Sequence, residues 1–292
     1  MAAGHEMTQI SVVIPSKNPA SIESTLESLL PARRFLGEIV IVDASLPPIA
    51  IPSSLTERLP VRVIASSALQ LEAECLGIEQ STSPRILLLD SDQLVTGGLI
   101  EELSLADLPA VVIPETCRGN GLVARLVRRN SEYLEETFRR RPSISVPVVP
   151  RFFWTRDLQR AVSSVRDRVR RTKHWPNNHM DTVLFYYWIK TNEFDLAVDV
   201  GFSTRQILHV VPGIGGLVAK AHKYGVGRGR LESTVSAGLS SEDRLLLDVI
   251  RRIDNQRVYR APGLGWNYAG VVYDAIRGAA YFSGVIWGRA SS

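Results

Sequence analysis

The segment Ile86–Asp92 reads ILLLDSD, so that four apolar residues lead directly into two aspartates separated by one serine. Two earlier segments are built in the same way. Ile10–Ile14 (ISVVI) ends at Pro15, and Glu38–Val42 (EIVIV) ends at Asp43. Because these runs are almost continuously apolar and do not alternate with polar residues, they are typical of strands covered on both faces.

Two segments with a helical pattern, Ser21–Leu30 and Ala68–Gln80, lie between these runs. A further β-branched run, Val61–Ile64, predicts another strand. Strands that alternate with helices are joined by crossover connections, which make neighbouring strands parallel. We therefore expect an α/β fold with a mainly parallel central sheet flanked by helices.

Polar residues follow three of the predicted strands. In open parallel sheets, ligands bind beyond the carboxyl ends of the strands. Pro15–Asn18, Asp43 and Asp90–Asp92 all fall at such ends. The sequence therefore predicts a single crevice lined by three strand ends, two of which carry carboxylates.

The second half of the chain is less regular. We expect helices at Leu122–Arg140, Ser241–Asn255 and Tyr268–Trp287, and strands at Val146–Val149 and Ala197–Val200. No internal repeat or low-complexity linker separates these elements. The simplest expectation is one compact domain with a helical C-terminal extension.

Composition excludes several classes of protein. Of the 292 residues, 45% are hydrophobic and 22% charged, which excludes a disordered tail protein, a collagen-like fibre and a small disulfide scaffold. The two cysteines, Cys75 and Cys117, form no CxxC pair, so we expect buried reduced thiols and no structural zinc site. No secretory signal and no uncharged apolar stretch long enough for a membrane span occur, so we expect a cytoplasmic protein. A net charge of +4 does not by itself indicate nucleic-acid binding, which we do not expect.

The two aspartates of the DSD turn could hold a metal ion. Asp90 and Asp92 stand two residues apart where a strand opens into a loop, so both can reach one hard divalent cation. Mg²⁺ or Mn²⁺ suits oxygen ligands and bridges to substrate phosphates. The alternative is an ordinary turn after a strand, in which the aspartate side chain forms hydrogen bonds with backbone groups of the turn.

Five segments together resemble landmarks of the family-2 glycosyltransferases, which are inverting enzymes with the GT-A nucleotide-sugar-binding fold. The first three are similar to an opening strand with P-x-x-N, a strand ending in V-D-x-S and an L-D-x-D turn. The fourth resembles the acidic pair that supplies the catalytic base, and the fifth a late His followed by a basic Tyr-Gly segment. In chain order they are Ser11–Asn18, Ile39–Ser45, Leu87–Asp92, His179–Phe185, and Leu208–Pro212 with Lys223–Gly229.

The chain departs from the family pattern at three points. Ala44 stands where the family often has a second aspartate, and Met180 stands where it has the glutamate of the acidic pair. Ala73–Gly77 (AECLG) replaces A-R-N-x-G, so the Arg and Asn with which the family contacts the donor from that helix are missing. The resemblance covers roughly residues 9 to 230. It implies a catalytic domain at 1–230, and the helical patterning of the remaining residues predicts an amphipathic C-terminal extension at 231–292.

The resemblance implies a single displacement at the anomeric carbon of the sugar. Asp181 would accept the proton of the acceptor hydroxyl, while Asp90, Asp92 and His209 would hold Mg²⁺ or Mn²⁺ against the diphosphate. The residues that the resemblance assigns to donor binding are Pro15, Ser16, Lys17, Asp43, Ser45, Asp90, Ser91, Lys223 and Arg228.

Each of these residues also has a simpler structural explanation. Asp181 could cap the helix that follows it, and Asp43 could only order a turn. His209 could be a core histidine bonded to backbone groups. Lys223 and Arg228 could belong to a solvated basic face.

The implied activity is metal-dependent transfer of a hexose from a nucleoside-diphosphate sugar, most often a UDP-sugar, to a hydroxyl acceptor. The acceptor could be a glycan, a lipid-linked intermediate or a small natural product. One alternative is a polyprenyl-phosphate sugar synthase, which would use a lipid phosphate as acceptor. Another is a non-catalytic nucleotide-sugar-binding or scaffold protein with the same fold.

Two features raise the question of membrane contact. Arg151–Lys173 is rich in basic residues, which are either a solvated helix face or a site for an anionic acceptor or lipid surface. The apolar face expected for Tyr268–Trp287 could lie in a membrane interface, pack on the catalytic domain or form a dimer contact. Peripheral attachment to the inner face of the membrane is therefore the alternative to a purely cytoplasmic location.

Overall fold

The computed structural model describes residues 8–19, 22–68, 70–119, 121–144, 146, 148–172, 180–210, 214–235, 244–249, 251–252 and 268–290. The chain forms two compact units. The first contains Met1–Thr116, Pro150–Ser163 and Trp188–Val210, and the second contains Cys117–Val149, Ser164–Tyr187 and Val211–Ser292. The expected domain boundary after residue 230 falls within helix α8 (Ile214–Val235), and this domain division stays a prediction.

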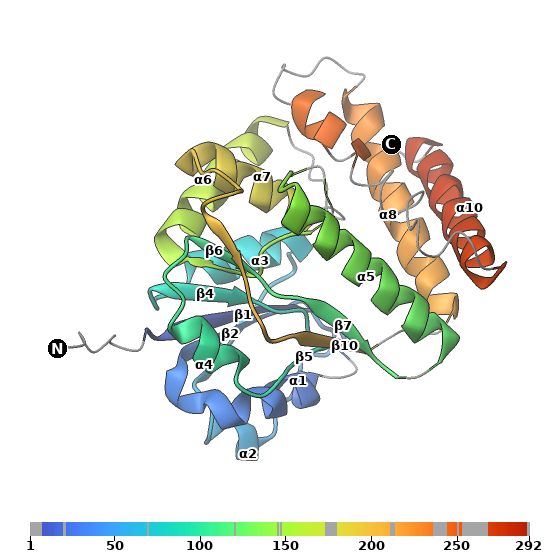
Figure 1. The fold of residues 1–292 in the computed structure, drawn as a ribbon. Helices are drawn as coiled ribbons and strands as arrows, with labels where there is room; N and C mark the ends of the chain where they lie inside the picture. The colour runs from blue at the N-terminus through green and yellow to red at the C-terminus, as the bar shows by residue number, and fades with distance from the viewer. Residues whose placement is uncertain are drawn as a thin grey trace. The chain divides into compact units, whose positions relative to one another are not determined.

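The first unit is built on a seven-stranded sheet with the order β3-β2-β1-β4-β8-β6-β9 (Figure 1). The pairs β1/β2, β1/β4, β2/β3 and β6/β9 are parallel, and β8 runs antiparallel to both of its neighbours. The strand bounds are β1 Ile10–Ser16, β2 Leu36–Asp43, β3 Val61–Ala65, β4 Arg85–Leu88, β6 Ala110–Val112, β8 Phe152–Trp154 and β9 Val200–Phe202. The predicted fold class, a mainly parallel sheet flanked by helices, is therefore confirmed.

Helices cover both faces of this sheet. On one face, Val12 and Ile14 of β1 share a buried cluster with Leu26 of α1 and Leu99 of α4. On the other face, Val40 and neighbouring side chains of β2 pack on α3. The helix bounds are α1 Ile22–Leu29, followed by the 3-10 helix Leu30–Phe35, then α2 Ser53–Thr56, α3 Gln70–Glu79 and α4 Leu99–Ser104. Burial on both faces explains why the strands read as continuous apolar runs.

Glycine at position 77 lets α3 approach the sheet closely. A Cβ atom at Gly77 would lie 2.5 Å from a methyl group of Val13 and 3.3 Å from one of Val42. The first contact is shorter than real Cβ atoms show and the second is tight, so glycine permits this distance between the helix and the strands.

A second, three-stranded sheet has the order β5-β10-β7. Its strands are β5 Gln93–Val95, β7 Glu115–Arg118 and β10 Ile207–Val210. β10 is antiparallel to β5, and His209 lies opposite Gln93 in this register. This pairing brings the end of β10 next to the turn that follows β4.

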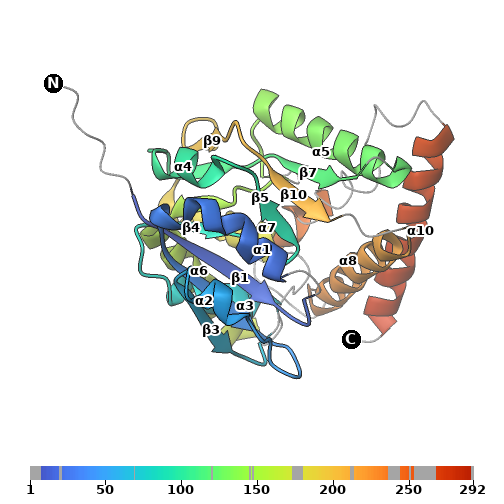
Figure 2. The ribbon, with the colours of Figure 1, turned by 90° about the horizontal axis from the view of Figure 1, so that it is seen from below.

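The second unit is mainly helical. Its elements include α5 Leu122–Arg140, parts of α6 Thr155–Thr172 and α7 Met180–Asn192, α8, and α10 Tyr268–Ala290. α8 and α10 lie side by side (Figure 1, Figure 2). Their backbones touch, because a Cβ atom at Gly225 would collide with the carbonyl of Tyr281, and one at Gly284 with the carbonyl of His222.

Some expected elements differ from the structure. The strand expected at Val146–Val149 is wrong: the described residues of this segment form tight turns, with Val146 N donating to Ser143 O and Val148 N to Val146 O. The strand expected at Ala197–Val200 begins only at Val200, because a turn closed by Asp195 N and the Asp199 carboxylate precedes it. Ser241–Asn255 is helical over the described residues 244–249 and 251–252, and the expected helices at 122–140 and 268–287 are present. Within the described part of the chain, no helix is both long and apolar enough to cross a bilayer.

Candidate functional site at the carboxyl ends of the strands

The ends of β1 and β2 lie next to each other, with Ser16 opposite Asp43 in the parallel register. Asp43 is buried, and its two carboxylate oxygens accept hydrogen bonds from the backbone N–H groups of Ser45 (3.0 Å) and Ile49 (2.9 Å). The carboxylate therefore orders the loop that follows β2. The turn-forming role expected as an alternative for Asp43 is present, and its role in nucleotide binding stays a prediction.

The loops after β1 and β2 are tied to each other. Asn18 N donates to Ser45 Oγ (2.7 Å), and Leu46 N donates to Asn18 Oδ1 (3.3 Å). Ala44 N also donates to the carbonyl of Ser16 (2.9 Å). Asn18 has a positive φ of 48°, a conformation that asparagine tolerates better than most residues. The two loops thus form one fixed edge of the predicted crevice.

Three further predicted donor residues lie on this edge. Lys17 is exposed and Pro15 is half-buried. The hydroxyl of Ser16 is buried and has no hydrogen-bond partner among the described residues. A buried hydroxyl without a partner lowers the stability of the fold, so packing alone does not explain a serine at this strand end.

The DSD turn continues β4 along β1. Leu89 N donates to Val13 O (3.0 Å), and Gln93 N closes the turn on Asp90 O (3.1 Å). Thr25 of α1 donates its hydroxyl to Ser91 O (3.0 Å), which fixes the middle of the turn. Asp92 is exposed at its tip.

Five side chains form a closed ring of polar contacts behind this turn. Gln93 Nε2 donates to Asp90 Oδ2 (3.1 Å) and lies 3.0 Å from His209 Nε2. His209 Nε2 is 2.7 Å from Glu115 Oε2, and Glu115 Oε1 accepts from Arg151 Nε (2.9 Å). Arg151 Nη2 closes the ring at 3.3 Å from Asp90 Oδ2. The ring contains two carboxylates and two basic side chains.

The backbone explains how Arg151 reaches the ring. Leu88 N donates to Arg151 O (2.8 Å), and Arg151 N donates to Val111 O (3.1 Å). The residue is thus held between the ends of β4 and β6, with its side chain only 9% exposed. A guanidinium this well buried needs carboxylate partners, which Asp90 and Glu115 supply.

Gln93 decides how His209 can bond. Gln93 is fully buried, and its Oε1 accepts from Asp90 N (2.9 Å), so its Nε2 group must be the one that faces Asp90 and His209. His209 Nε2 can donate to Glu115 or accept from Gln93, but a single ring nitrogen cannot do both at full strength.

The charges favour the first arrangement. Burial alone would raise the pKa of Glu115, but the charges of Arg151 and His209 outweigh it and hold that pKa well below its ordinary value. Burial alone would lower the pKa of His209, but Glu115, and then Asp90, raise it above its ordinary value. The raised pKa of His209 therefore favours the arrangement in which its Nε2 donates to Glu115.

The expected metal ligands are not gathered around one point. Asp90 Oδ2 contacts Arg151 and Gln93, His209 Nε2 lies against Glu115, and Asp92 is exposed. Within the described residues, no three His, Cys, Asp or Glu side chains lie close enough together to share a metal ion. A histidine ligand must be unprotonated at the nitrogen that binds the metal, and a carboxylate ligand needs a free oxygen. Among the described residues, the contacts of the Asp90 carboxylate use only Oδ2, so the misfit with a divalent ion shared by Asp90, Asp92 and His209 lies in the separation of these side chains and in the contacts of His209 Nε2.

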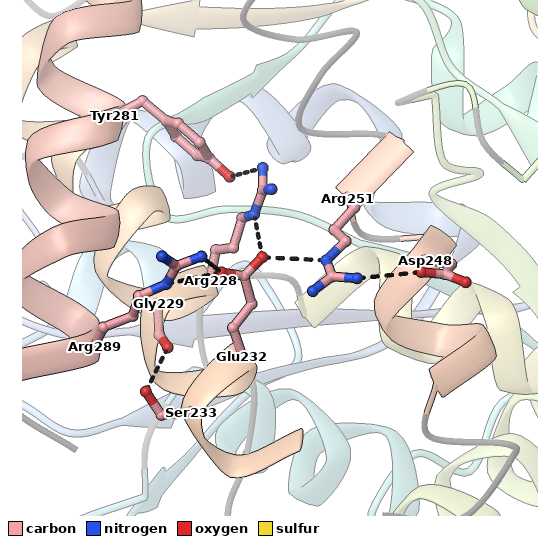
Figure 3. Close-up of polar contacts among 8 residues, drawn as sticks. All are labelled: Arg228, Gly229, Glu232, Ser233, Asp248, Arg251, Tyr281 and Arg289. Atoms are coloured by element: carbon pink, nitrogen blue, oxygen red, sulfur yellow. Dashed lines mark hydrogen bonds and ion pairs between the residues drawn. The ribbon is translucent and has the colours of Figure 1, made fainter. Parts of the chain in front are cut away.

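The remaining predicted residues belong to the second unit. Asp181 is in the first turn of α7, and its side chain lies outside the described residues, as does the whole segment 174–179. Lys223 is exposed on α8. Arg228 donates to Glu232 Oε1 (3.0 Å) and to the hydroxyl of Tyr281 (3.1 Å), within a cluster that also includes Arg251 and Arg289 (Figure 3). Their roles in catalysis and donor binding stay predictions.

Sequence reasoning missed three members of the ring, Gln93, Glu115 and Arg151. A signal existed for Glu115, because it follows the apolar run Val111–Pro114 in the way that Ser16 follows Val12–Pro15. Arg151 stands between Pro150 and the apolar Phe152, where an isolated charge indicates a buried partner. Nothing local distinguishes Gln93.

No protein-family model matches the chain, and no curated protein matches it. Solved structures with a similar course of the chain include TarS 1–349 from S. aureus, at 13% identity and a TM-score of 0.47, covering 97% of this chain and 90% of that chain. The mannosyltransferase PcManGT from Pyrobaculum calidifontis, solved with GDP-Man and Mn²⁺, has 12% identity and a TM-score of 0.49, covering 97% and 87%. Glucosyl-3-phosphoglycerate synthase from Mycobacterium tuberculosis, solved with Mn²⁺, UDP and phosphoglyceric acid, has 16% identity and a TM-score of 0.44, covering 75% and 77%.

Proposed function

We propose that the chain is a glycosyltransferase that moves a hexose from a nucleoside-diphosphate sugar, a UDP-sugar first among them, to a hydroxyl acceptor. The observation that carries this proposal is the polar edge formed by three adjacent parallel strands. The loops after β1 and β2 are bonded to each other, and the turn after β4 is backed by the ring of five polar side chains. Ligand sites of parallel sheets lie at such edges.

The donor nucleotide would lie against the loops after β1 and β2. Their surface offers the exposed side chains of Lys17 and Asn18 and the loop held by Asp43 and Ser45. A lysine ammonium is a suitable point charge for a phosphate group. The Asp90–Ser91 turn, the neighbouring strand end, would face the diphosphate. Lys223 would add a further positive charge, and Arg228 would do so only by leaving Glu232 and Tyr281.

Asp181 is the proposed base. Its carboxylate would take the proton from the acceptor hydroxyl while the hydroxyl oxygen attacks the anomeric carbon. The bond between that carbon and the diphosphate oxygen breaks in the same step, and the nucleoside diphosphate leaves. A single displacement of this kind inverts the configuration of the anomeric carbon.

The resemblance also implies a Mg²⁺ or Mn²⁺ ion beside the diphosphate, which would neutralise charge on the leaving group. In the present arrangement such an ion would bind at Asp90, Asp92 and His209 only after His209 left Glu115 and the three side chains came closer together. Dependence on the ion is measured in the experiment that tests the function.

The test is nucleotide-dependent thermal stabilisation followed by transfer. The wild-type protein is melted with a panel of nucleoside diphosphates and their sugars, with and without Mn²⁺, and release of free nucleotide is measured in parallel. One nucleotide is expected to raise the melting temperature, and the Asp43→Asn variant is expected to lose most of that shift. Glu57→Ala, which removes an exposed carboxylate of the same unit, should respond like the wild type.

Transfer is then scored by NMR of the product, which should show inversion at the anomeric carbon. Asp181→Asn should keep the nucleotide-dependent shift and lose transfer and donor hydrolysis. If no nucleotide or nucleotide sugar alters the melting curve with or without metal, the proposal is wrong. A shift without turnover would favour the non-catalytic binding protein.

A further inference from the structure

Helix α10 has two different faces. Tyr281, Gly284 and Val285 are buried, and this face packs against α8 through the backbone contacts of Gly225 and Gly284. Because glycine on both helices lets the backbones touch, the contact fixes which side of α10 is turned away from α8.

The other face is apolar and exposed. Ile276 is 39% exposed, Phe282 45%, Ile286 69% and Trp287 64%. Phe282 and Ile286 are four residues apart, as are Ser283 and Trp287, and Ala275, Ala279 and Ser283 on this side of the helix are also exposed. We refer to Ile276, Phe282, Ile286 and Trp287 as the apolar row. Large apolar residues exposed on one face of a helix, with aromatic rings among them, mark an interaction surface.

The charge of the chain is divided unequally between its two units. The second unit, which contains α10, has 23 Lys and Arg residues and 11 Asp and Glu residues, a formal net charge of +12. The first unit has 11 Lys and Arg residues and 19 Asp and Glu residues, a formal net charge of −8. The modest total of +4 therefore conceals one strongly basic unit.

We propose that the exposed face of α10 binds the interface of a membrane that contains anionic lipids, with the helix lying along the surface. The apolar row would enter the boundary between headgroups and acyl chains, where tryptophan and phenylalanine are favoured. The positive charge of the second unit would attract the anionic headgroups over distances of a Debye length.

The charge also distinguishes this partner from others. A second copy of the same face would bring two units of charge +12 together, which opposes dimerisation through α10. The phosphates of an RNA or DNA strand would be attracted to the positive charge of the second unit, but they would offer no apolar surface to Ile276 and Ile286. An anionic bilayer offers negative headgroups to the positive charge and acyl chains to the apolar row.

The test is flotation of the full chain with vesicles, without donor or acceptor, so that its outcome does not depend on glycosyl transfer. Vesicles of phosphatidylcholine with about 30% phosphatidylglycerol are compared with pure phosphatidylcholine, at about 0.1 M and about 0.5 M salt. The wild type is expected to bind the anionic vesicles, to bind them less at high salt, and to bind pure phosphatidylcholine weakly.

The double variant Ile286→Ser, Trp287→Ser should lower the partition coefficient by about tenfold or more, since it removes two large apolar side chains from the interface. Val198→Ser is the matched control, because Val198 is also 69% exposed but lies in the first unit. It should bind like the wild type. Far-UV circular dichroism checks that each variant keeps its helices, and Trp287→Phe, which keeps an aromatic ring, should retain most of the binding.

Three results would overturn the proposal. The first is no binding of wild type to anionic vesicles at low salt. The second is equal binding of wild type and the folded double variant. The third is a concentration-dependent sedimentation coefficient that the double variant abolishes, which would assign the α10 face to self-association.

Discussion

The Nε2 atom of His209 lies 2.7 Å from Oε2 of Glu115, and the second carboxylate oxygen of Glu115 accepts from Arg151 Nε at 2.9 Å. One glutamate at the start of β7 thus holds two basic side chains that come from β10 and from the residue before β8. Through Arg151 it also fixes the partner of Asp90. We expect Glu115 to be the residue on which the ring most depends.

Glu115→Gln should destabilise the first unit by about 1–2 kcal/mol. The amide carries no charge, so Arg151 loses one of its two carboxylate contacts in the ring and His209 loses its main anionic partner. The estimate is below that for a fully buried ion pair, since the Glu115 side chain is 31% exposed. The free energy of unfolding in urea measures the change.

Glu101→Gln is the matched control for this change. It removes an ion pair with Arg34 in the same unit, but both side chains are more than half exposed. The expected effect is within about 0.5 kcal/mol. If the two variants were equally stable, Glu115 would not hold the ring together.

The His209–Glu115 contact should also give stability a particular pH dependence. The pKa of His209 is raised in the folded state, so its contribution is complete below the unfolded value of 6.5 and is lost as the pH rises through the higher folded value. The pKa of Glu115 is lowered, so its contribution is complete above the unfolded value of 4.5 and is lost as the pH falls. The difference in unfolding free energy between wild type and Glu115→Gln should therefore be largest between about pH 4.5 and 6.5.

Urea unfolding of both proteins across pH 4 to 9, with histidine titration followed by NMR, measures this difference. The His209 resonance should titrate at lower pH in Glu115→Gln than in wild type. A difference that stays constant from the acidic to the alkaline end would show that His209 is not charged in the folded protein.

How far the sequence predicted this structure depends on the range of the interactions involved. β1, β2, β3 and β4 and the helices α1 and α3 were expected from continuous apolar runs and helical spacing, both of which are local patterns. Because the carboxyl ends of neighbouring parallel strands meet at one edge of a sheet, the shared location of Pro15, Asp43 and Asp90 could also be predicted. The C-terminal helix α10 was expected for the same reason.

The polar ring could not be predicted in this way. Gln93 and His209 are 116 residues apart in the chain, and His209 and Glu115 are 94 apart. Their strands have three or four residues each, too few for a periodic pattern. Two of the three predicted metal ligands, Asp90 and His209, are members of the ring. Their charged partners in the ring, Arg151 and Glu115, were not predicted.

Asp43→Asn tests whether the loop edge is needed for donor binding. The carboxylate accepts from Ser45 N and Ile49 N, and an asparagine offers one oxygen and one amino group, so one of these backbone N–H groups loses its acceptor. We expect a loss of about 1–2 kcal/mol in stability. Nucleotide affinity should fall by about tenfold, since the loop contacts that fix the edge are weakened.

Isothermal titration with the nucleotide that stabilises the wild type measures this change. The control is Ile100→Val, which shortens a buried side chain of α4, is expected to lower stability by about 0.5–1.5 kcal/mol, and leaves the β1 and β2 loops and the DSD turn intact. If both variants lost nucleotide affinity equally, the effect of Asp43→Asn would reflect lower stability and not the loop edge.

The contact between α8 and α10 predicts opposite effects for two glycine-to-alanine changes. A Cβ atom at Gly284 would meet backbone atoms of His222 and Val226, which cannot move aside as a flexible side chain does. We expect Gly284→Ala to lower the free energy of unfolding by about 1–3 kcal/mol. Gly215, in the first turn of α8, has open space where its Cβ would be, so Gly215→Ala should be neutral or stabilising by up to about 1 kcal/mol. Thermal unfolding of the two variants beside wild type compares them directly, and equal melting temperatures would show that α8 and α10 do not pack backbone to backbone in solution.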